Sequence, residues 1–201
     1  RDLRWQIDER ATFEKDSTSL IFDSFLIHSG DQTVSFDGNI GANPADTLHF
    51  NIENFQLTSL DSMGFGVQKE VAGLINLNGA ISKFYTSSEV EAEGRVDGLI
   101  IGDRRIGDLV LSSGYQGGSK DILINATLID DSLELVSFQG IYNTSGKDKL
   151  SGKLILDDFD LDIINEFGVP QVSDFSGLAN GQIQVEGVLN KPQLKGYIDF
   201  E

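Results

Sequence analysis

Residues Lys153–Glu201 read KLILDDFDLDIINEFGVPQVSDFSGLANGQIQVEGVLNKPQLKGYIDFE, and this stretch decides how the rest of the chain is interpreted. Within it, polar and apolar residues alternate from Gln182 to Glu186 between two glycines, and a second alternating run covers Leu194–Phe200. Such a period of two places apolar side chains on one face of a strand and polar ones on the other. The stretch therefore predicts β-strands with one apolar and one polar face.

The same period of two recurs along the whole sequence, most cleanly at Ile122, Ile124, Ala126 and Leu128. Strands buried on both faces, as in parallel sheets, would instead read as continuous apolar runs. We count roughly thirteen strands at the spacing of 8–12 residues that is typical of all-β folds. The sequence therefore predicts an all-β protein with a long, largely antiparallel sheet.

Turn signals separate the predicted strands, and all three prolines, including Pro170 and Pro192, are expected in turns. Only Phe55–Lys69 and Phe159–Phe167 space their apolar residues like a helix, and nearby glycines would keep both helices very short. The expected turn dipeptides are Asp37-Gly38, Asn43-Pro44, Asn78-Gly79, Asp97-Gly98, Gly117-Gly118, Asp130-Asp131 and Ser145-Gly146.

Three blocks of the first half return in the same order in the second half. Val34–Gly38 returns as Val136–Gly140, and Phe50–Leu57 returns as Leu154–Leu161. The third block, GLINLNG from Gly73, is matched to GQIQVEG from Gly181. We therefore expect residues 1–201 to form one segment of a longer chain. It would hold two repeats of about a hundred residues, approximately 20–110 and 111–201.

Composition excludes several classes of function. The net charge of −17 repels the phosphates of nucleic acids and anionic membrane surfaces, so we expect no nucleic-acid partner. The chain has no cysteine, so neither disulfides nor thiolate metal sites can form. No apolar run approaches the 18 or more residues of a membrane-spanning helix.

The string from Phe175 to Gly187, followed by Asn190-Lys191-Pro192-Gln193-Leu194-Lys195-Gly196, resembles the repeat of the TamB family. Asp103–Leu111, with Ile-Gly-Asp before a strand, is similar to another recurring segment of that family. The first repeat departs from the pattern, because Ser82-Lys83-Phe84-Tyr85 replaces the Asn-x-Pro turn after Gly79.

This resemblance implies a β-taco, a sheet curled into a U-shaped trough with an apolar concave face. It further implies a periplasmic protein of a diderm bacterium, tethered to the inner membrane by a helix outside this segment. The implied partners are phospholipid acyl chains or nascent outer-membrane protein strands, and an outer-membrane barrel of the TamA type. The implied roles are phospholipid transport to the outer membrane and assembly of outer-membrane proteins, without catalysis or cofactors.

Physical reasoning leads part of the way to the same trough. About thirteen strands at about 4.8 Å each would span about 60 Å, and open sheets of that size curl, close or split. A curled sheet left open would expose an apolar groove too large to lack a purpose. The expected groove residues are Val34, Phe36, Leu48, Phe50, Ile52, Ile75, Leu77, Ile122, Ile124, Leu128, Leu154, Leu156, Ile183, Val185, Ile198 and Phe200.

The candidate catalytic and metal-binding residues do not have the spacing that a catalytic or metal-binding motif requires. His28 and His49 lie on separate predicted strands with no nucleophile motif, and we expect both at exposed strand positions. Asp158-x-Asp160-x-Asp162 imitates a calcium loop, but Ile163 replaces the glycine that the loop requires. Arg104 and Arg105 fit either ion pairs at a turn or a contact with a lipid phosphate at the groove rim. We expect no enzyme, no metal site and no cofactor.

Two alternatives to a lipid groove stay open at this point. The sheet edge could receive a strand of an outer-membrane β-barrel protein, which would make the chain a chaperone acting by β-augmentation. Alternatively, the strands could form a surface adhesin or carbohydrate-binding β-sandwich, with two sheets packed face to face. Trp5 is expected in the core or groove, with contact to a partner protein as the alternative.

Overall fold

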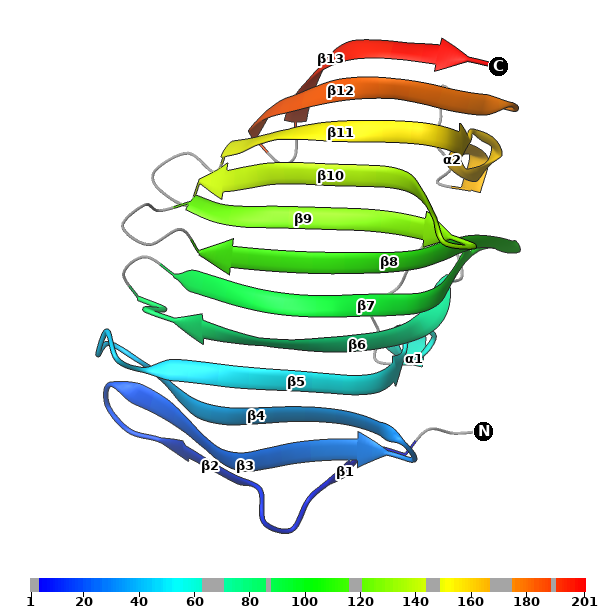
Figure 1. Cartoon of the computed structure of the whole chain (residues 1–201). Coiled ribbons are helices and arrows are strands. Elements are labelled where there is room, and N and C mark those ends of the chain that lie inside the picture. The colour runs from blue at the N-terminus through cyan, green and yellow to red at the C-terminus, as the bar shows by residue number, and fades with distance from the viewer. Residues whose placement is uncertain are drawn as a thin grey trace.

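The computed structural model contains one antiparallel sheet of 13 strands (Figure 1). It describes residues 4–62, 71–85, 88–115, 121–143, 149–166, 175–188 and 191–201. The strands are β1 (Gln6–Ile7), β2 (Thr12–Lys15), β3 (Ser19–Ser29), β4 (Gln32–Gly41), β5 (Thr47–Gln56), β6 (Val71–Ser82), β7 (Glu89–Ile101), β8 (Arg104–Tyr115), β9 (Asp121–Asp130), β10 (Leu133–Asn143), β11 (Lys149–Asp160), β12 (Leu178–Val188) and β13 (Lys191–Phe200).

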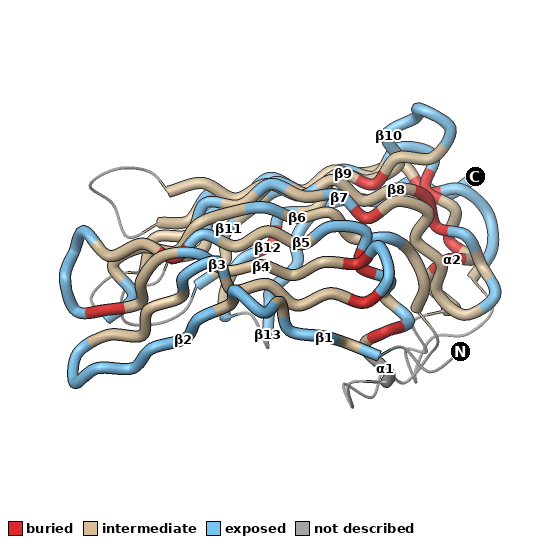
Figure 2. Tube along the Cα trace, turned by 90° about the horizontal axis from the view of Figure 1, so that it is seen from below, coloured by how far each residue is buried: buried red, intermediate tan, exposed pale blue. Residues whose placement is uncertain are grey.

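The strands follow one another in chain order from β3 to β13, while β1 and β2 both pair with β3. From β3 onward each strand pairs with the next one along the chain, which is the order of an antiparallel meander. The sheet is open and curled into a trough (Figure 2). The predicted all-β curled sheet is confirmed, and the described residues do not form the two packed sheets of a sandwich.

Both short helices lie at the same end of the strands, at the right of Figure 1. Helix α1 (Ser59–Ser62) connects β5 to β6, and α2 (Asp162–Glu166) follows β11. The prediction of very short helices at these two places is confirmed. The strand-ends that carry α1 and α2 are called the helix end below, and the opposite ends are called the open end.

The buried core gathers at the helix end rather than along the sheet. Ile163 of α2 is 4% exposed and packs with Leu128, Phe159 and Ala179 on the apolar face. On α1, the Ser59 hydroxyl donates a hydrogen bond to the buried side chain of Gln32. Both helices therefore cover the apolar face at the helix end.

Several predicted turns are wrong. Asp37-Gly38, Asn78-Gly79 and Asp97-Gly98 all lie inside strands, and Pro192 lies in the last strand instead of a turn. Proline is tolerated there because β13 pairs with β12 alone and forms an edge of the sheet. Asn43-Pro44 and Asp130-Asp131 do lie at strand connections. Gly117-Gly118, Ser145-Gly146, Pro170 and Asn190 lie outside the described residues.

Candidate functional site: an apolar trough covered at one end

Strand register joins the apolar side chains into continuous rows across the sheet. Residues that pair directly on antiparallel strands point to the same face, with their Cβ atoms about 5 Å apart. Starting from Val34, one such row crosses ten strands through Ile52, Leu77, Gly94, Leu111, Ala126, Phe138, Leu154, Ile183 and Gly196. The face is therefore apolar from β4 to β13.

The register places every predicted groove residue on this one face. These residues are Val34, Phe36, Leu48, Phe50, Ile52, Ile75, Leu77, Ile122, Ile124, Leu128, Leu154, Leu156, Ile183, Val185, Ile198 and Phe200. The neighbouring row on the other face is polar throughout: Ser35, Asn51, Asn78, Glu93, Ser112, Asn125, Gln139, Lys153, Gln184 and Lys195.

Among the described residues, no second layer of secondary structure covers the apolar face along most of its length. The chain has 12683 Å² of accessible surface. A compact monomer of its mass would have about 9300 Å². Leu111, in the middle of the apolar face, is 36% exposed, and Leu194 and Phe200 near the edge exceed 60%. The trough is therefore open to solvent outside the helix end.

A hollow deepens the middle of the trough. It has a volume of about 350 Å³, and its walls come mainly from Leu77, Val90, Leu111, Ile122 and Ile124. The floor is low here because the apolar-face residues of β7 and β8 include small ones, Ala92, Gly94 and Ser113. The hollow thus lies where several side chains of the apolar face are small.

Four bulges in the described sheet share one construction. In each, a residue with positive φ interrupts the pairing, and its backbone N–H donates to an Asn or Asp side chain on the next strand. The pairs are Ser24 with Asp37 at 3.3 Å, Asn54 with Asn76 at 2.9 Å, Gly98 with Asp108 at 2.8 Å, and Asp158 with Asn180 at 2.9 Å. Because a bulge bends its strand and increases local twist, these four contribute to the curl of the sheet.

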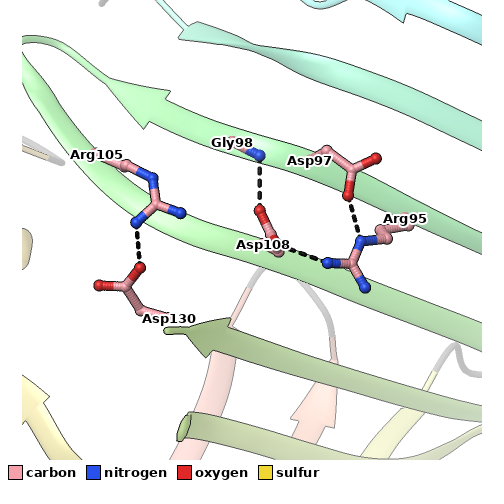
Figure 3. Close-up of polar contacts among 6 residues, drawn as sticks. All are labelled: Arg95, Asp97, Gly98, Arg105, Asp108 and Asp130. Atoms are coloured by element: carbon pink, nitrogen blue, oxygen red, sulfur yellow. Dashed lines mark hydrogen bonds and ion pairs between the residues drawn. The ribbon is translucent and has the colours of Figure 1, made fainter. Parts of the chain in front are cut away.

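An ion-pair network holds one of these bulges (Figure 3). The Asp108 carboxylate accepts from Gly98 N–H and from Arg95 at 2.6 Å, while Arg95 also pairs with Asp97. The Gly98 hydrogen bond is the main reason that the pKa of Asp108 lies below its ordinary value, with Arg95 adding to it. Arg105, on the same strand as Asp108, pairs with Asp130 across to β9.

The helix end is clamped by contacts between residues far apart in sequence. Arg104 at the start of β8 pairs with Asp160 at 2.6 Å and with Asp162 at 3.1 Å. Asn165 of α2 exchanges two hydrogen bonds with the Phe175 backbone, at 2.8 and 3.1 Å. Arg104 and Arg105 are therefore both in ion pairs, but with aspartates of other strands and of α2 rather than with their own turn.

The open end of the trough is lined by different side chains. Tyr115 and Tyr142 both pair in register with Ile122, so both lie on the apolar face at its last row. The Lys83 ammonium lies 5.9 Å from the centroid of the Tyr115 ring and forms an ion pair with Glu89. The hydrogen bond that Lys83 donates to the Glu89 carboxylate raises the pKa of Lys83 above its ordinary value.

Comparison with known proteins finds no match: neither a family model, nor a curated protein, nor a solved structure resembles this chain significantly.

The other candidate residues lie apart from one another. His28 and His49 belong to β3 and β5, on the polar face. Asp160 and Asp162 contact Arg104, whereas the Asp158 carboxylate accepts from Asn180 on β12. In the described ranges, no three His, Asp or Glu side chains gather as a metal site would require. No helix in the same ranges is long and apolar enough to cross a membrane.

Trp5 packs against Phe55, with ring centroids 5.8 Å apart, at the helix end. This contact agrees with the expected core or groove position. Its Nε1 is buried, without a hydrogen-bond partner among the described residues.

The bulges are the structural feature that the sequence analysis missed. An acidic residue, the positive-φ residue and then Phe or Leu form the same short motif at all four: Asp23-Ser24-Phe25, Glu53-Asn54-Phe55, Asp97-Gly98-Leu99 and Asp157-Asp158-Phe159. This motif is a signal that could have found them.

The structure also corrects the third repeat block. Leu57 N–H donates to Gly73 O, and Leu161 N–H donates to Gly177 O, so Gly73 corresponds to Gly177 rather than to Gly181.

Proposed function

We propose that this chain is a periplasmic segment of a TamB-like envelope protein whose trough carries phospholipid acyl chains toward the outer membrane. In this proposal a helix outside the segment tethers the protein to the inner membrane, and an outer-membrane barrel of the TamA type is its partner. The same trough would serve nascent outer-membrane strands if protein is the cargo. The chain acts without catalysis, cofactor or metal.

The observation that carries this proposal is the continuous, partly exposed apolar face. Transfer of an acyl chain through water costs about 0.8 kcal/mol per CH₂, so a chain of about 16 carbons faces a barrier of about 12 kcal/mol. Rows of apolar side chains that run from strand to strand lower that barrier at every step along the stack. Transport along such a face is diffusive and needs no chemistry.

The resemblance of the carboxyl-terminal stretch to the TamB repeat supports the cellular setting of the proposal. The polar face supports it as well, since an exposed row of amides and charges keeps one side of the sheet hydrated while the other contacts lipid.

Site-specific photocrosslinking in cells tests the proposal. A photoreactive residue at Leu111 lies on the apolar face, and one at Glu93 lies on the polar face of the adjacent strand, which makes a matched control. We expect phospholipid adducts from position 111 and none from position 93. Equal labelling from both positions, or labelling of soluble proteins alone, would rule the conduit out.

A second candidate, β-augmentation, is favoured by strand β13. All of its residues are exposed, including Leu194, Tyr197 and Phe200, and it pairs with β12 alone. An incoming strand would need this backbone edge and not the apolar face. A Leu111→Lys substitution should therefore spare crosslinks from β13 to nascent strands while it abolishes lipid adducts.

A further inference from the structure

Strand β13 presents a backbone edge that no other described strand than β12 covers (Figure 1). All ten of its residues are exposed. Leu178 and Glu201 exchange two backbone hydrogen bonds, at 3.0 and 3.1 Å, which fixes the side on which each residue bonds. Backbone groups of successive residues alternate between the two sides of a strand, so the odd-numbered residues of β13 bond to β12 and the even-numbered ones point outward. The outward residues are Pro192, Leu194, Gly196, Ile198 and Phe200.

Proline limits the part of this edge that can pair with another strand. Pro192 has no N–H, so at its position the edge accepts a hydrogen bond but donates none. The four outward residues from Leu194 to Phe200 each keep one N–H and one C=O, which together provide for eight backbone hydrogen bonds. A long edge of this kind is a template for a further strand.

The side chains of this segment complement a second copy of the same segment. Two antiparallel copies with Tyr197 on the two-fold axis place Lys195 opposite Asp199 once on each side of the axis. Neither Lys195 nor Asp199 forms an ion pair among the described residues. On the apolar face, Leu194 lies opposite Phe200, and the smallest residue, Gly196, lies opposite Ile198.

From this complementarity we propose that two copies of the chain join edge to edge through β13, antiparallel, with Tyr197 on the two-fold axis. The dimer goes beyond the proposed function, since it concerns the sheet edge and not the lipid. The side chains of Leu194 and Gly196 lie on the same face as Val185 and Ile183 of β12. Pairing through β13 therefore joins the apolar faces of the two copies into one.

The neighbouring registers are less favourable. An axis at Lys195 would bring two lysines face to face, which destabilises a strand pair. An axis at Gly196 would pair Pro192 with an outward residue whose carbonyl then has no donor. An axis at Ile198 would leave the outward backbone of Leu194 unpaired. Charge and backbone bonding therefore select the same register.

The opposite edge of the described sheet is interrupted, so association stops at two copies. Strand β3 is covered there by β1, of two residues, and β2, of four. Between them the Ala11 N–H donates to the Asp8 carbonyl oxygen at 3.0 Å, which forms a turn. Short and broken edge strands discourage pairing. A contact of β13 with β13 uses the same surface on both copies and closes, so we expect a dimer and not a fibre.

Disulfide trapping tests the arrangement, because the chain has no cysteine of its own. Tyr197→Cys places two cysteines directly opposite each other at a pair without backbone hydrogen bonds, where the Cα atoms are about 4.5 Å apart and a disulfide can form. Gln193→Cys, on the same strand and face, is the matched control. Its two copies would be eight residues apart along the strand, or about 27 Å. We expect covalent dimers from Tyr197→Cys alone, whereas equal linking at both positions would show random collision.

Charge reversal provides a second readout, measured as the dissociation constant in sedimentation equilibrium. Lys195→Glu and Asp199→Lys each place like charges opposite one another twice, so each should weaken dimerisation at least about tenfold. A mixture of the two variants restores both attractive pairs, and the heterodimer should form about as tightly as the wild-type dimer. Lys153→Glu, on the polar face of β11, makes the same charge change away from the edge and should have little effect.

Two results would overturn the dimer. One is a wild-type chain that stays monomeric over the whole concentration range. The other is a mixture of Lys195→Glu and Asp199→Lys that associates no better than either variant alone. If a nascent strand occupies β13 instead, the purified chain stays monomeric, and Tyr197→Cys in cells links to that protein and not to a second copy. None of these results changes the phospholipid adducts expected from position 111, so the dimer and the lipid conduit fail separately.

Discussion

In the floor of the trough, aromatic rings pack closely against glycines, and one pair of substitutions tests this. A Cβ placed on Gly152 would lie 2.6 Å from the Phe138 ring and 2.8 Å from the Gln139 carbonyl oxygen. A Cβ on Gly114, in β8 of the same sheet, would meet nothing within 4 Å. Both glycines have backbone conformations that alanine can adopt, since neither has positive φ. The same substitution should therefore have opposite effects at the two positions.

Gly152→Ala should destabilise the fold by about 1–3 kcal/mol, because the ring and the strand must move apart to admit the methyl group. Gly114→Ala should stabilise it by up to about 1 kcal/mol, because alanine loses less conformational entropy than glycine in a strand. In a domain of this size, each kcal/mol changes the melting temperature by about 2–4 °C. Thermal unfolding followed by circular dichroism measures both variants. If Gly152→Ala melts at or above the temperature of Gly114→Ala, Phe138 does not lie over Gly152.

Three further substitutions test other parts of the structure. Asn180→Ala removes the acceptor of the hydrogen bond from the Asp158 backbone N–H, and should lower the free energy of unfolding measured in urea by about 1 kcal/mol. Asn125→Ala, on the polar face but not at a bulge, is the control and should lower it by less. Asp108→Asn removes a carboxylate whose pKa in the folded state is lowered. The melting temperature of the wild type should therefore exceed that of the variant by a constant amount above about pH 5, and the difference should shrink as the pH falls below about 4. A difference that grows on acidification would contradict the lowered pKa. Arg104→Ala breaks the ion pairs to Asp160 and Asp162. Backbone amide hydrogen exchange should therefore accelerate at residues 162–166 but not in β3 and β4. Unchanged exchange rates at residues 162–166 would show that these ion pairs do not hold α2 in place.

Alternation alone was enough to predict the sheet and the composition of its apolar face. Pairs such as Val34 with Ile52 and Phe138 with Leu154 keep the same face because side chains alternate with a period of two. A slip of one residue would turn every apolar side chain outward, so the pattern specifies the register as well as the strands. The predicted groove residues therefore lie on one face, although their role in binding lipid stays a prediction.

Turn chemistry was less informative, because glycine has more than one use in a sheet. Gly79 was expected in a turn, but it lies under the Phe50 ring, and a Cβ there would lie 2.6 Å from that ring. Asp97-Gly98 forms a bulge, where positive φ is required inside a strand. Dipeptides of this kind mark tight backbone geometry, and only the long-range pairing decides between a turn and a bulge.

Contacts at the two ends of the trough could not be predicted from local patterns. Arg104 lies far from Asp160 in sequence, and the curl of the sheet brings them together across β8 and β11. The open end has the same origin, because Tyr115 and Tyr142 lie at the ends of β8 and β10, and Lys83 directly follows β6. Their shared position depends on strands of nearly equal length that end in line.

Native mass spectrometry of the purified chain after incubation with phospholipid vesicles tests whether the apolar face binds phospholipid. We predict phospholipid adducts on the wild-type protein and on Glu93→Lys, whose substitution lies on the polar face. We predict their loss from Leu111→Lys, which places a charge in the middle of the apolar face. A wild-type protein that takes up no phospholipid, or adducts that survive Leu111→Lys unchanged, would show that the apolar face is not a phospholipid-binding surface.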